Sequence, residues 1–149
     1  MTDRFRFRAK ALEDTPSISV KKGQFVYGYY RPENKQDEDY SSGRDVHLIS
    51  MQYGDHWVDV EIDFATLGQC TGIKDKNGKL IYEGDIVRYT RYALRDLEEE
   101  FTYKGIIRWE LYEFNIKNWE DEKEVIGNLH ENPELLKSVT NCNQSEVDK

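Results

Sequence analysis

Carboxylates spaced two residues apart are the side chains with the clearest potential for chemistry in this sequence. Glu83 and Asp85 flank Gly84, and Glu131 follows later in the chain. Acid–base hydrolysis uses two carboxyl groups in different environments around one substrate. An aspartate beside a glycine is also typical of a turn in which the side-chain oxygen accepts a backbone N–H. The turn interpretation is favoured, and a carboxylate-based hydrolase at Glu83, Asp85 and Glu131 is the alternative.

The histidines and cysteines show no pattern typical of a metal centre or of a nucleophile. His47, His56 and His130 lack the HxxxH and HExxH spacings of helical zinc sites. Cys70 and Cys142 are far apart and form no CxxC pair. Cys70 is therefore interpreted as a small buried apolar residue. We expect no catalytic residue, no cofactor and no metal site.

Arginine alternates with phenylalanine near the start of the chain. On a strand, Arg4, Arg6 and Arg8 share one face and the phenylalanines share the other. Cations beside aromatic rings are typical of single-strand binders, so this face is a candidate anion surface and a nucleic-acid module is a weaker alternative. The rings point away from the arginines, however, and the net charge of −8 disfavours a polyanion. A solvated or salt-bridged strand face is the favoured interpretation.

Tyrosine and tryptophan supply a second candidate binding surface. The chain has ten tyrosines and three tryptophans. These residue types are enriched in protein interfaces because they bury area and keep a polar group. Core and interface positions are equally supported for them. The candidates are Tyr27, Tyr29, Trp57, Trp109 and Trp119.

Alternating runs predict the strands that position these residues. Residues 58–64 alternate apolar with acidic side chains, and residues 24–30 are dense in aromatic and β-branched types. We expect 58–64 to lie beside 4–8, with carboxylates against arginines, each pair contributing roughly 0.2–1 kcal/mol. The polar residues 32–43 are expected to form a loop or an elaborated hairpin tip. The side chains expected to be buried in the second run are Val58, Val60, Ile62 and Phe64.

Two glycine-containing segments predict turns. Asn77 and Gly78 both tolerate positive φ, so they predict a type I′ hairpin turn. Gly84 permits a tight bend before the next strand, and Asp85 is suited to accept a backbone N–H there. All four residues are therefore candidate structural residues.

Helical signals are confined to two short segments. Asn132 is suited to an N-cap and Pro133 to the first helical position, which predicts a short helix at about 132–139. Within 90–101, apolar residues at helical spacing predict another short helix.

These elements predict a mainly β protein, with a small SH3-like barrel, additional antiparallel strands and a short C-terminal helix. One domain is expected over 1–140. Its N-terminal β part covers about 1–68 and its barrel-like part about 69–130, and residues 141–149 form a polar tail.

Several stretches resemble, in order, those of the YopX family, small proteins encoded in phages and prophages. The central signature is TLGQCTGIKDKNG at 66–78 followed by IYEGDIV at 81–87. FRFRAK at 5–10 is similar to the opening strand, FVYGY at 25–29 to the aromatic second block, and EVIGNLHENPELL at 124–136 to the closing block. The resemblance implies a β-rich, oligomeric protein of unknown activity, and it supplies no catalytic residue.

Three features depart from that resemblance. Cys70 stands where the family usually has an aromatic residue, and residues 32–45 and 90–100 match no family block. If these two segments determine the partner, the resemblance does not identify it.

The expected function is a non-catalytic, oligomeric binding module, a phage or prophage accessory protein that binds a host or phage macromolecule. Its expected partners are further copies of itself and a host or phage protein. Nucleic acid is disfavoured by net charge, and no membrane is expected. No apolar run resembles a secretory signal or a membrane span, so the cytoplasm of a bacterial host is the expected location.

Overall fold

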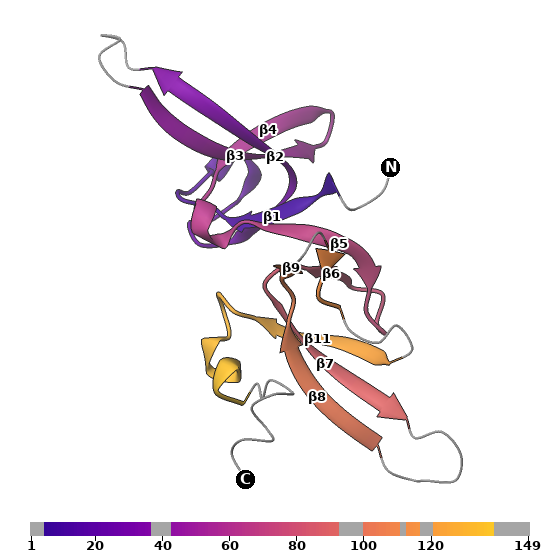
Figure 1. The fold of residues 1–149 in the computed structure, drawn as a ribbon. Coiled ribbons are helices and arrows are strands. Elements are labelled where there is room, and N and C mark those ends of the chain that lie inside the picture. Colours follow the sequence, from indigo (N-terminus) through magenta and orange to yellow (C-terminus); the bar gives the residue numbers. More distant parts are fainter. Residues whose placement is uncertain (1–4, 37–42, 93–99, 111–112, 117–120, 139–149) are drawn as a thin grey trace. The chain divides into compact units, whose positions relative to one another are not determined.

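Short antiparallel strands build this protein (Figure 1). The computed structural model describes residues 5–36, 43–92, 100–110, 113–116 and 121–138. The elements in chain order are β1 (Phe7–Lys10), the 3-10 helix η2 (Pro16–Ile18), β2 (Phe25–Gln36), β3 (Gly43–Tyr53), β4 (His56–Glu61), the 3-10 helix η3 (Phe64–Thr66), β5 (Gly68–Lys74), β6 (Leu80–Tyr82), β7 (Asp85–Tyr92), β8 (Glu100–Ile106), β9 (Trp109–Glu110), β10 (Glu113–Phe114), β11 (Glu122–Asn128) and the 3-10 helix η4 (Pro133–Ser138). The mainly β class expected from sequence is confirmed.

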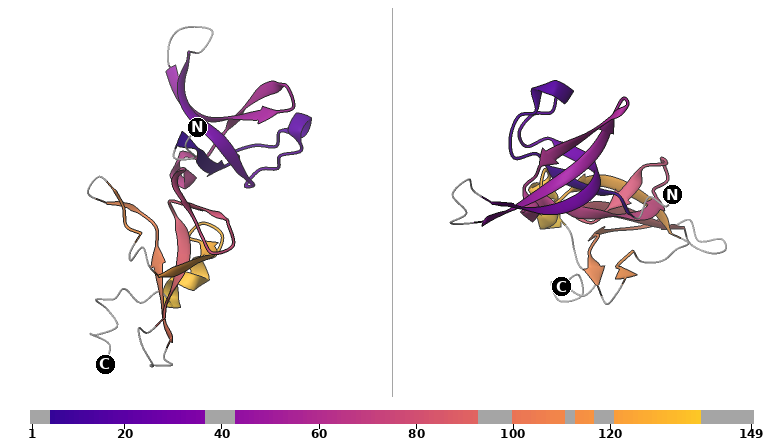
Figure 2. Two further views of the ribbon diagram at one scale, coloured as in Figure 1. Left: turned by 90° about the vertical axis from the view of Figure 1, so that its right-hand side faces the viewer. Right: turned by 90° about the horizontal axis from the view of Figure 1, so that it is seen from above.

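The chain divides into two compact units, Met1–Cys70 and Thr71–Lys149. The predicted division into a part at about 1–68 and a part at about 69–130 is close to this boundary. Strands of the first unit follow the order β4-β3-β2-β1-β5, and β5 continues past the boundary to pair with β6. The long β2–β3 hairpin of the first unit can be followed in both views of Figure 2.

The predicted pairing of residues 4–8 with residues 58–64 is wrong. β1 pairs with β2 on one side and with β5 on the other, and it meets the end of the acidic run only at the Ala11↔Ile62 bridge. The carboxylates of β4 find other arginines because β3 and β2 lie between β4 and β1. Asp59 pairs with Arg31 of β2, and Glu61 with Arg44 of β3 at 3.3 Å.

Aliphatic side chains fill the core of the first unit. Val60 and Ile62 are buried as expected, and Val58 packs at the margin. Phe64 is 55% exposed because η3 begins there and ends the alternation; the Asp63 carboxylate accepts the N–H of Ala65. The fully buried members of this core are Ala9, Ala11, Ile18, Val20, Val26, Ile49, Val60 and Ile62.

The described residues of the polar stretch 32–43 are strand. β2 continues through Pro32 to Gln36, which pairs with Gly43, and residues 37–42 lie outside the described residues. Of the two interpretations offered for this stretch, the structure favours the hairpin. The stretch has no apolar period because both of its faces are exposed at this end of the hairpin.

The second unit contains a three-stranded sheet with the order β11-β7-β8 and a separate β9–β10 hairpin. Its core comprises Ile81, Val87, Tyr89 and Ile107. The predicted SH3-like barrel is not found among the described strands, since β8 and β11 each pair with β7 and the sheet does not close. Closure depends on pairings between distant strands, which local patterning does not encode.

A 3-10 helix stands where the C-terminal helix was expected at about 132–139. The Leu135 N–H donates to Asn132 O at 3.0 Å, an i→i+3 bond. The Asn132 side chain turns back and accepts the N–H of Asn128 at 3.2 Å. Of the other helix predicted, Phe101 lies on β8; residues 93–99 and the predicted tail at 141–149 lie outside the described residues.

Candidate binding site

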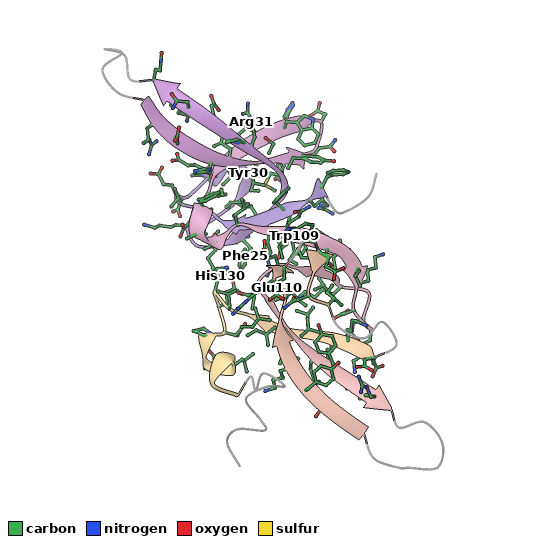
Figure 3. All side chains as sticks on the ribbon, viewed as in Figure 1. Phe25, Tyr30, Arg31, Trp109, Glu110 and His130 are labelled. Carbon is green, nitrogen blue, oxygen red and sulfur yellow. The ribbon has the colours of Figure 1, made fainter. Side chains whose placement is uncertain are left out.

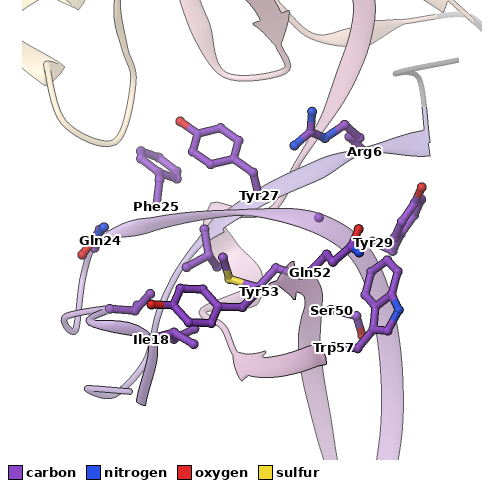
Figure 4. A pocket seen from close by; sticks show the side chains of 14 residues that line it. Arg6, Ile18, Gln24, Phe25, Tyr27, Tyr29, Ser50, Gln52, Tyr53 and Trp57 are labelled. Carbon is purple, nitrogen blue, oxygen red and sulfur yellow. The ribbon is translucent and has the colours of Figure 1, made fainter. Parts of the chain in front are cut away.

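A groove of about 870 Å³ lies in the first unit, where β2 and β3 separate (Figure 4). β2 pairs with β3 from the Tyr29↔Ser50 position onward, whereas its residues 25–28 pair with β1. β3 continues to Tyr53 in partnership with β4. The groove is lined by Arg6, Ile18, Val20, Gln24, Phe25, Val26, Tyr27, Gly28, Tyr29, Ser50, Met51, Gln52, Tyr53 and Trp57.

Gly28 of β2 lies close to the backbone of β3. A Cβ added there would lie 2.2 Å from Ser50 O and 3.0 Å from Ser50 C, both backbone atoms. Only glycine therefore fits without moving β3. The groove opens from this close approach.

Aromatic rings form the rim of the groove. Trp57 is 59% exposed, Tyr53 52% and Tyr27 40%. The rings of Tyr29 and Trp57 are tilted against each other with centroids 5.8 Å apart. Figure 4 shows the Tyr27 and Phe25 rings on one side of β2 and the Tyr53 ring on the other. The sequence candidates Arg6, Tyr27, Tyr29 and Trp57 are thus brought together.

Three cations lie near one side of this rim: Arg6, just before β1, and Arg8 and Lys10 on β1. Arg6 is exposed and lines the groove. Arg8 is buried, with its guanidinium carbon 4.9 Å from the centroid of Phe25, and the Lys10 ammonium is 5.5 Å from the same ring. The interpretation of a solvated or salt-bridged arginine face stays a prediction: Arg6 is exposed, Arg8 is buried, and Arg4 lies outside the described residues.

The aromatic partners of these cations come from β2. Arg8 lies opposite Tyr27, and Lys10 lies opposite Phe25, so each pair shares a face of the sheet. The phenylalanine Phe7 does point to the other face, where it packs against the core and Tyr30. Sequence alternation within one strand could not show which rings a neighbouring strand would bring to the arginines.

The floor of the groove is aliphatic. Ile18, Val20, Val26 and Met51 line it, and all four also belong to or pack against the core of the first unit. Sequence reasoning did not single out these residues, nor Gln24, Gln52 and Tyr53. The sequence could have indicated Tyr53 as a candidate, since it is an aromatic residue directly before the Gly54–Asp55 turn.

The predicted carboxylate pair is part of a turn. Asp85 is buried, and its Oδ2 accepts the Tyr82 N–H at 2.8 Å while Gly84 bends the chain at a φ of +91°. Glu131 is exposed, and its Oε2 accepts a bond from the Asn128 amide at 3.3 Å. None of these carboxylates lines the groove.

Asp75 organises the hairpin that contains Asn77 and Gly78. Its carboxylate accepts the backbone N–H groups of Asn77 and Lys79 at 2.9 Å and of Val125 at 3.0 Å. Burial alone would raise the pKa of Asp75, but the three N–H donors and the Lys79 charge together lower it. This side chain therefore ties the hairpin to β11.

The hairpin turn is not type I′, because Asn77 does not have positive φ. Gly78 adopts a φ of +80°, and its N–H donates to Asp75 O at 3.0 Å. A type I turn followed by one left-handed glycine explains this arrangement.

Trp109 is not among the residues that line the groove. Trp109 is exposed on the β9–β10 hairpin of the second unit, where it meets Phe114 edge-on with ring centroids 4.7 Å apart (Figure 3). Trp119 lies outside the described residues.

The histidines occupy separate places. His47 stacks on Phe64, and its Nδ1 lies 2.7 Å from the Tyr30 hydroxyl. His56 stands beside Asp55 at an exposed turn. Over the described ranges, no group of three or more histidine, cysteine, aspartate or glutamate side chains could hold a metal ion.

These features define an all-β protein. Its second unit has turns held by aspartate side chains, and its first unit has an aromatic groove. The sequence model described as YopX protein matches residues 6–137, and the chain belongs to this family. Among solved structures, the chain is similar to protein EF1440 from Enterococcus faecalis at 25% identity. That match covers 88% of this chain and 96% of the other, with a TM-score of 0.45.

A search of curated proteins finds no match. In the part of the chain that the structure describes, no helix is both long and apolar enough to cross a membrane.

Proposed function

We propose that this YopX-family chain is a non-catalytic binding module that engages a host or phage protein through the groove of the first unit. It acts as a phage or prophage accessory protein in the cytoplasm of a bacterial host.

The single observation that carries this proposal is the convergence of exposed aromatic side chains at one groove. Trp57, Tyr53 and Tyr27 all line the groove and remain substantially exposed, with Tyr27 and Tyr53 on opposite sides of β2. Exposed apolar area of this kind is characteristic of interaction surfaces, and tryptophan and tyrosine supply much of the binding energy there. The rim also carries hydrogen-bonding groups from Gln24 and Gln52, as binding sites do.

Affinity capture from lysogenic or phage-infected bacteria tests the proposal. The wild-type chain is compared with Trp57→Ala and with Tyr27→Ala, and captured proteins are identified by mass spectrometry. Trp109→Ala is the matched control, because it removes an exposed tryptophan from the second unit. We expect a specific protein that both groove variants lose and the control keeps. Capture that is unchanged in the groove variants, or is lost only in the control, would overturn the assignment.

Self-association is the second part of the proposal. The family resemblance and the edge strands of both units motivate it, since open strand edges invite pairing between copies. Size-exclusion chromatography with light scattering measures the mass directly. A strictly monomeric species at micromolar concentration would contradict this part and leave the groove untouched.

A further inference from the structure

The chemistry of the groove points to one kind of occupant. We propose that it binds an extended peptide segment in which an acidic side chain neighbours a proline or an aromatic residue. This inference rests on the proposed function and adds the chemistry of the partner.

Charge is the first argument. Among the described residues that line the groove there is a cation, Arg6, and no carboxylate, in a chain with a net charge of −8. Arg8 and Lys10 lie near the Phe25 ring, at 4.9 Å and 5.5 Å from its centroid. A carboxylate in the ligand can pair with the exposed Arg6 guanidinium by two parallel hydrogen bonds.

One carboxylate approaches the lining from outside. Asp59 accepts a hydrogen bond from Ser50 Oγ, but it is also paired with Arg31. Its charge is therefore compensated locally. The exposed Arg6 guanidinium stands at the surface of the groove, where an anion can reach it.

Shape is the second argument. The β2 segment Phe25–Tyr29 that lines the groove is about 16 Å long at a rise of roughly 3.3 Å per residue. An extended segment of similar length can lie along it. Tyr53, Trp57 and Tyr27 present ring surfaces at the rim. Proline and aromatic side chains pack well on such rings. Proline-rich segments are already extended before binding, so they lose little conformational entropy when they bind.

A nucleic-acid strand fits these observations less well. Each nucleotide carries a phosphate, so single-strand binders follow the backbone with a series of cations. This lining offers one exposed arginine, and the whole-chain charge repels a polyanion at low salt. Single-stranded DNA is therefore a competing outcome of the test.

Fluorescence anisotropy with defined probes tests the inference. The first probe is a synthetic dodecapeptide repeating Glu-Pro-Tyr, the second replaces each glutamate with lysine, and the third is an oligothymidylate of equal length. We expect the glutamate probe to bind in preference to the other two. Arg6→Glu and Trp57→Ala should each weaken its binding by about tenfold or more, a change of about 1.4 kcal/mol.

Arg108→Glu is the control for charge, because it makes the same charge change at an exposed residue of the second unit. Amide NMR spectra of all variants establish that they are folded. The Arg6 backbone, whose carbonyl accepts the Cys70 N–H at 2.8 Å, is kept in Arg6→Glu. In the wild-type spectrum, the glutamate probe should shift the amide signals of Phe25–Tyr29 and of Met51–Tyr53.

Several results would overturn the peptide inference. They are no binding of the glutamate probe at millimolar concentration, equal binding of the lysine probe, tighter binding of oligothymidylate, or equal weakening by Arg108→Glu. The proposed function is tested separately. A captured protein that depends on Trp57, together with failure of the glutamate probe, would keep the groove as a binding site and reject this ligand chemistry.

Discussion

The two units of this chain use polar side chains in opposite ways. In the second unit, Asp75 and Asp85 are buried and accept backbone N–H groups, so they hold turns in place. In the first unit the core is aliphatic, and the groove side chains Tyr27, Tyr53 and Trp57 stand at the surface. Stability of the second unit thus depends on individual carboxylates, whereas the first unit keeps its rim side chains available for a ligand.

This difference separates two kinds of residue within the family resemblance. The central signature at 66–87 contains Asp75, Gly78 and Gly84, which shape turns. The block at 25–29 supplies the β2 side of the groove. Mutations in the first set should therefore reduce stability, and most mutations at the groove rim should reduce binding alone.

The largest expected effect is that of Asp75→Ala. The change removes one buried carboxylate that accepts three backbone N–H groups, so we expect a loss of about 2–4 kcal/mol. Urea unfolding measures the free energy, and native-state hydrogen exchange reports the second unit separately. Asp55→Ala, at a highly exposed turn, is the control and should change stability by less than about 0.5 kcal/mol. Equal losses in the two variants would refute the framework role of Asp75.

Gly28→Ala should have the next largest effect, and in the first unit. The new methyl group would meet the Ser50 backbone at 2.2 Å, so β3 must move, at a cost of about 1–3 kcal/mol. Gly43→Ala is the matched control, since its methyl group would meet only the Asn34 side-chain amide, which can turn away. Thermal unfolding of both variants, with exchange rates for β2 and β3, measures the difference. A loss in Gly43→Ala as large as in Gly28→Ala would contradict the close approach.

Lowering the pH should destabilise the second unit by less than the two mutations above change stability. The folded-state pKa of Asp75 lies below its ordinary value of 3.8, because the three N–H donors outweigh the burial that would raise it. Its contribution is therefore fully present above the unfolded pKa and is lost as pH falls through the folded pKa. Below about pH 4, the protection of second-unit amides relative to their intrinsic exchange rates should fall in the wild type and change less in Asp75→Asn. Identical acid profiles would argue against this linkage.

The smallest expected effect on stability is that of Trp57→Ala. Because this side chain is 59% exposed, its removal should change the free energy of unfolding by less than about 0.5 kcal/mol. Its effect on the glutamate probe should nevertheless be large. If urea unfolding shows a loss above about 2 kcal/mol, Trp57 belongs to the framework and the contrast between the units is lost.

Local patterns in the sequence predicted where the strands lie better than they predicted which strands pair with each other. Alternation correctly indicated that Val60 and Ile62 are buried, but it extended to Phe64, where the Asp63-capped 3-10 helix ends the strand. The polar half of β2 carried no periodic signal because neither of its faces meets the core at that end. Barrel closure was likewise out of reach, because it depends on strand pairs far apart in the chain.

The candidate site shows the same division. Tyr27, Tyr29, Trp57 and Arg6 could be selected by residue type, but their meeting depends on the register between β1, β2 and β3. Gly28 looked like one more strand residue, and its role follows only from the approach of Ser50 O. The sequence thus showed which residue types could form a binding site, but it did not show which of them lie close together.

The burial of Cys70 gives this protein a built-in reporter. Its side chain has no exposed surface, and its N–H donates to Arg6 O, next to the segment that lines the groove. A thiol reagent can reach that sulfur only when the structure around β5 opens. In a Cys142→Ser background, the alkylation rate of Cys70 would therefore measure how often β5, which crosses the boundary between the two units, opens.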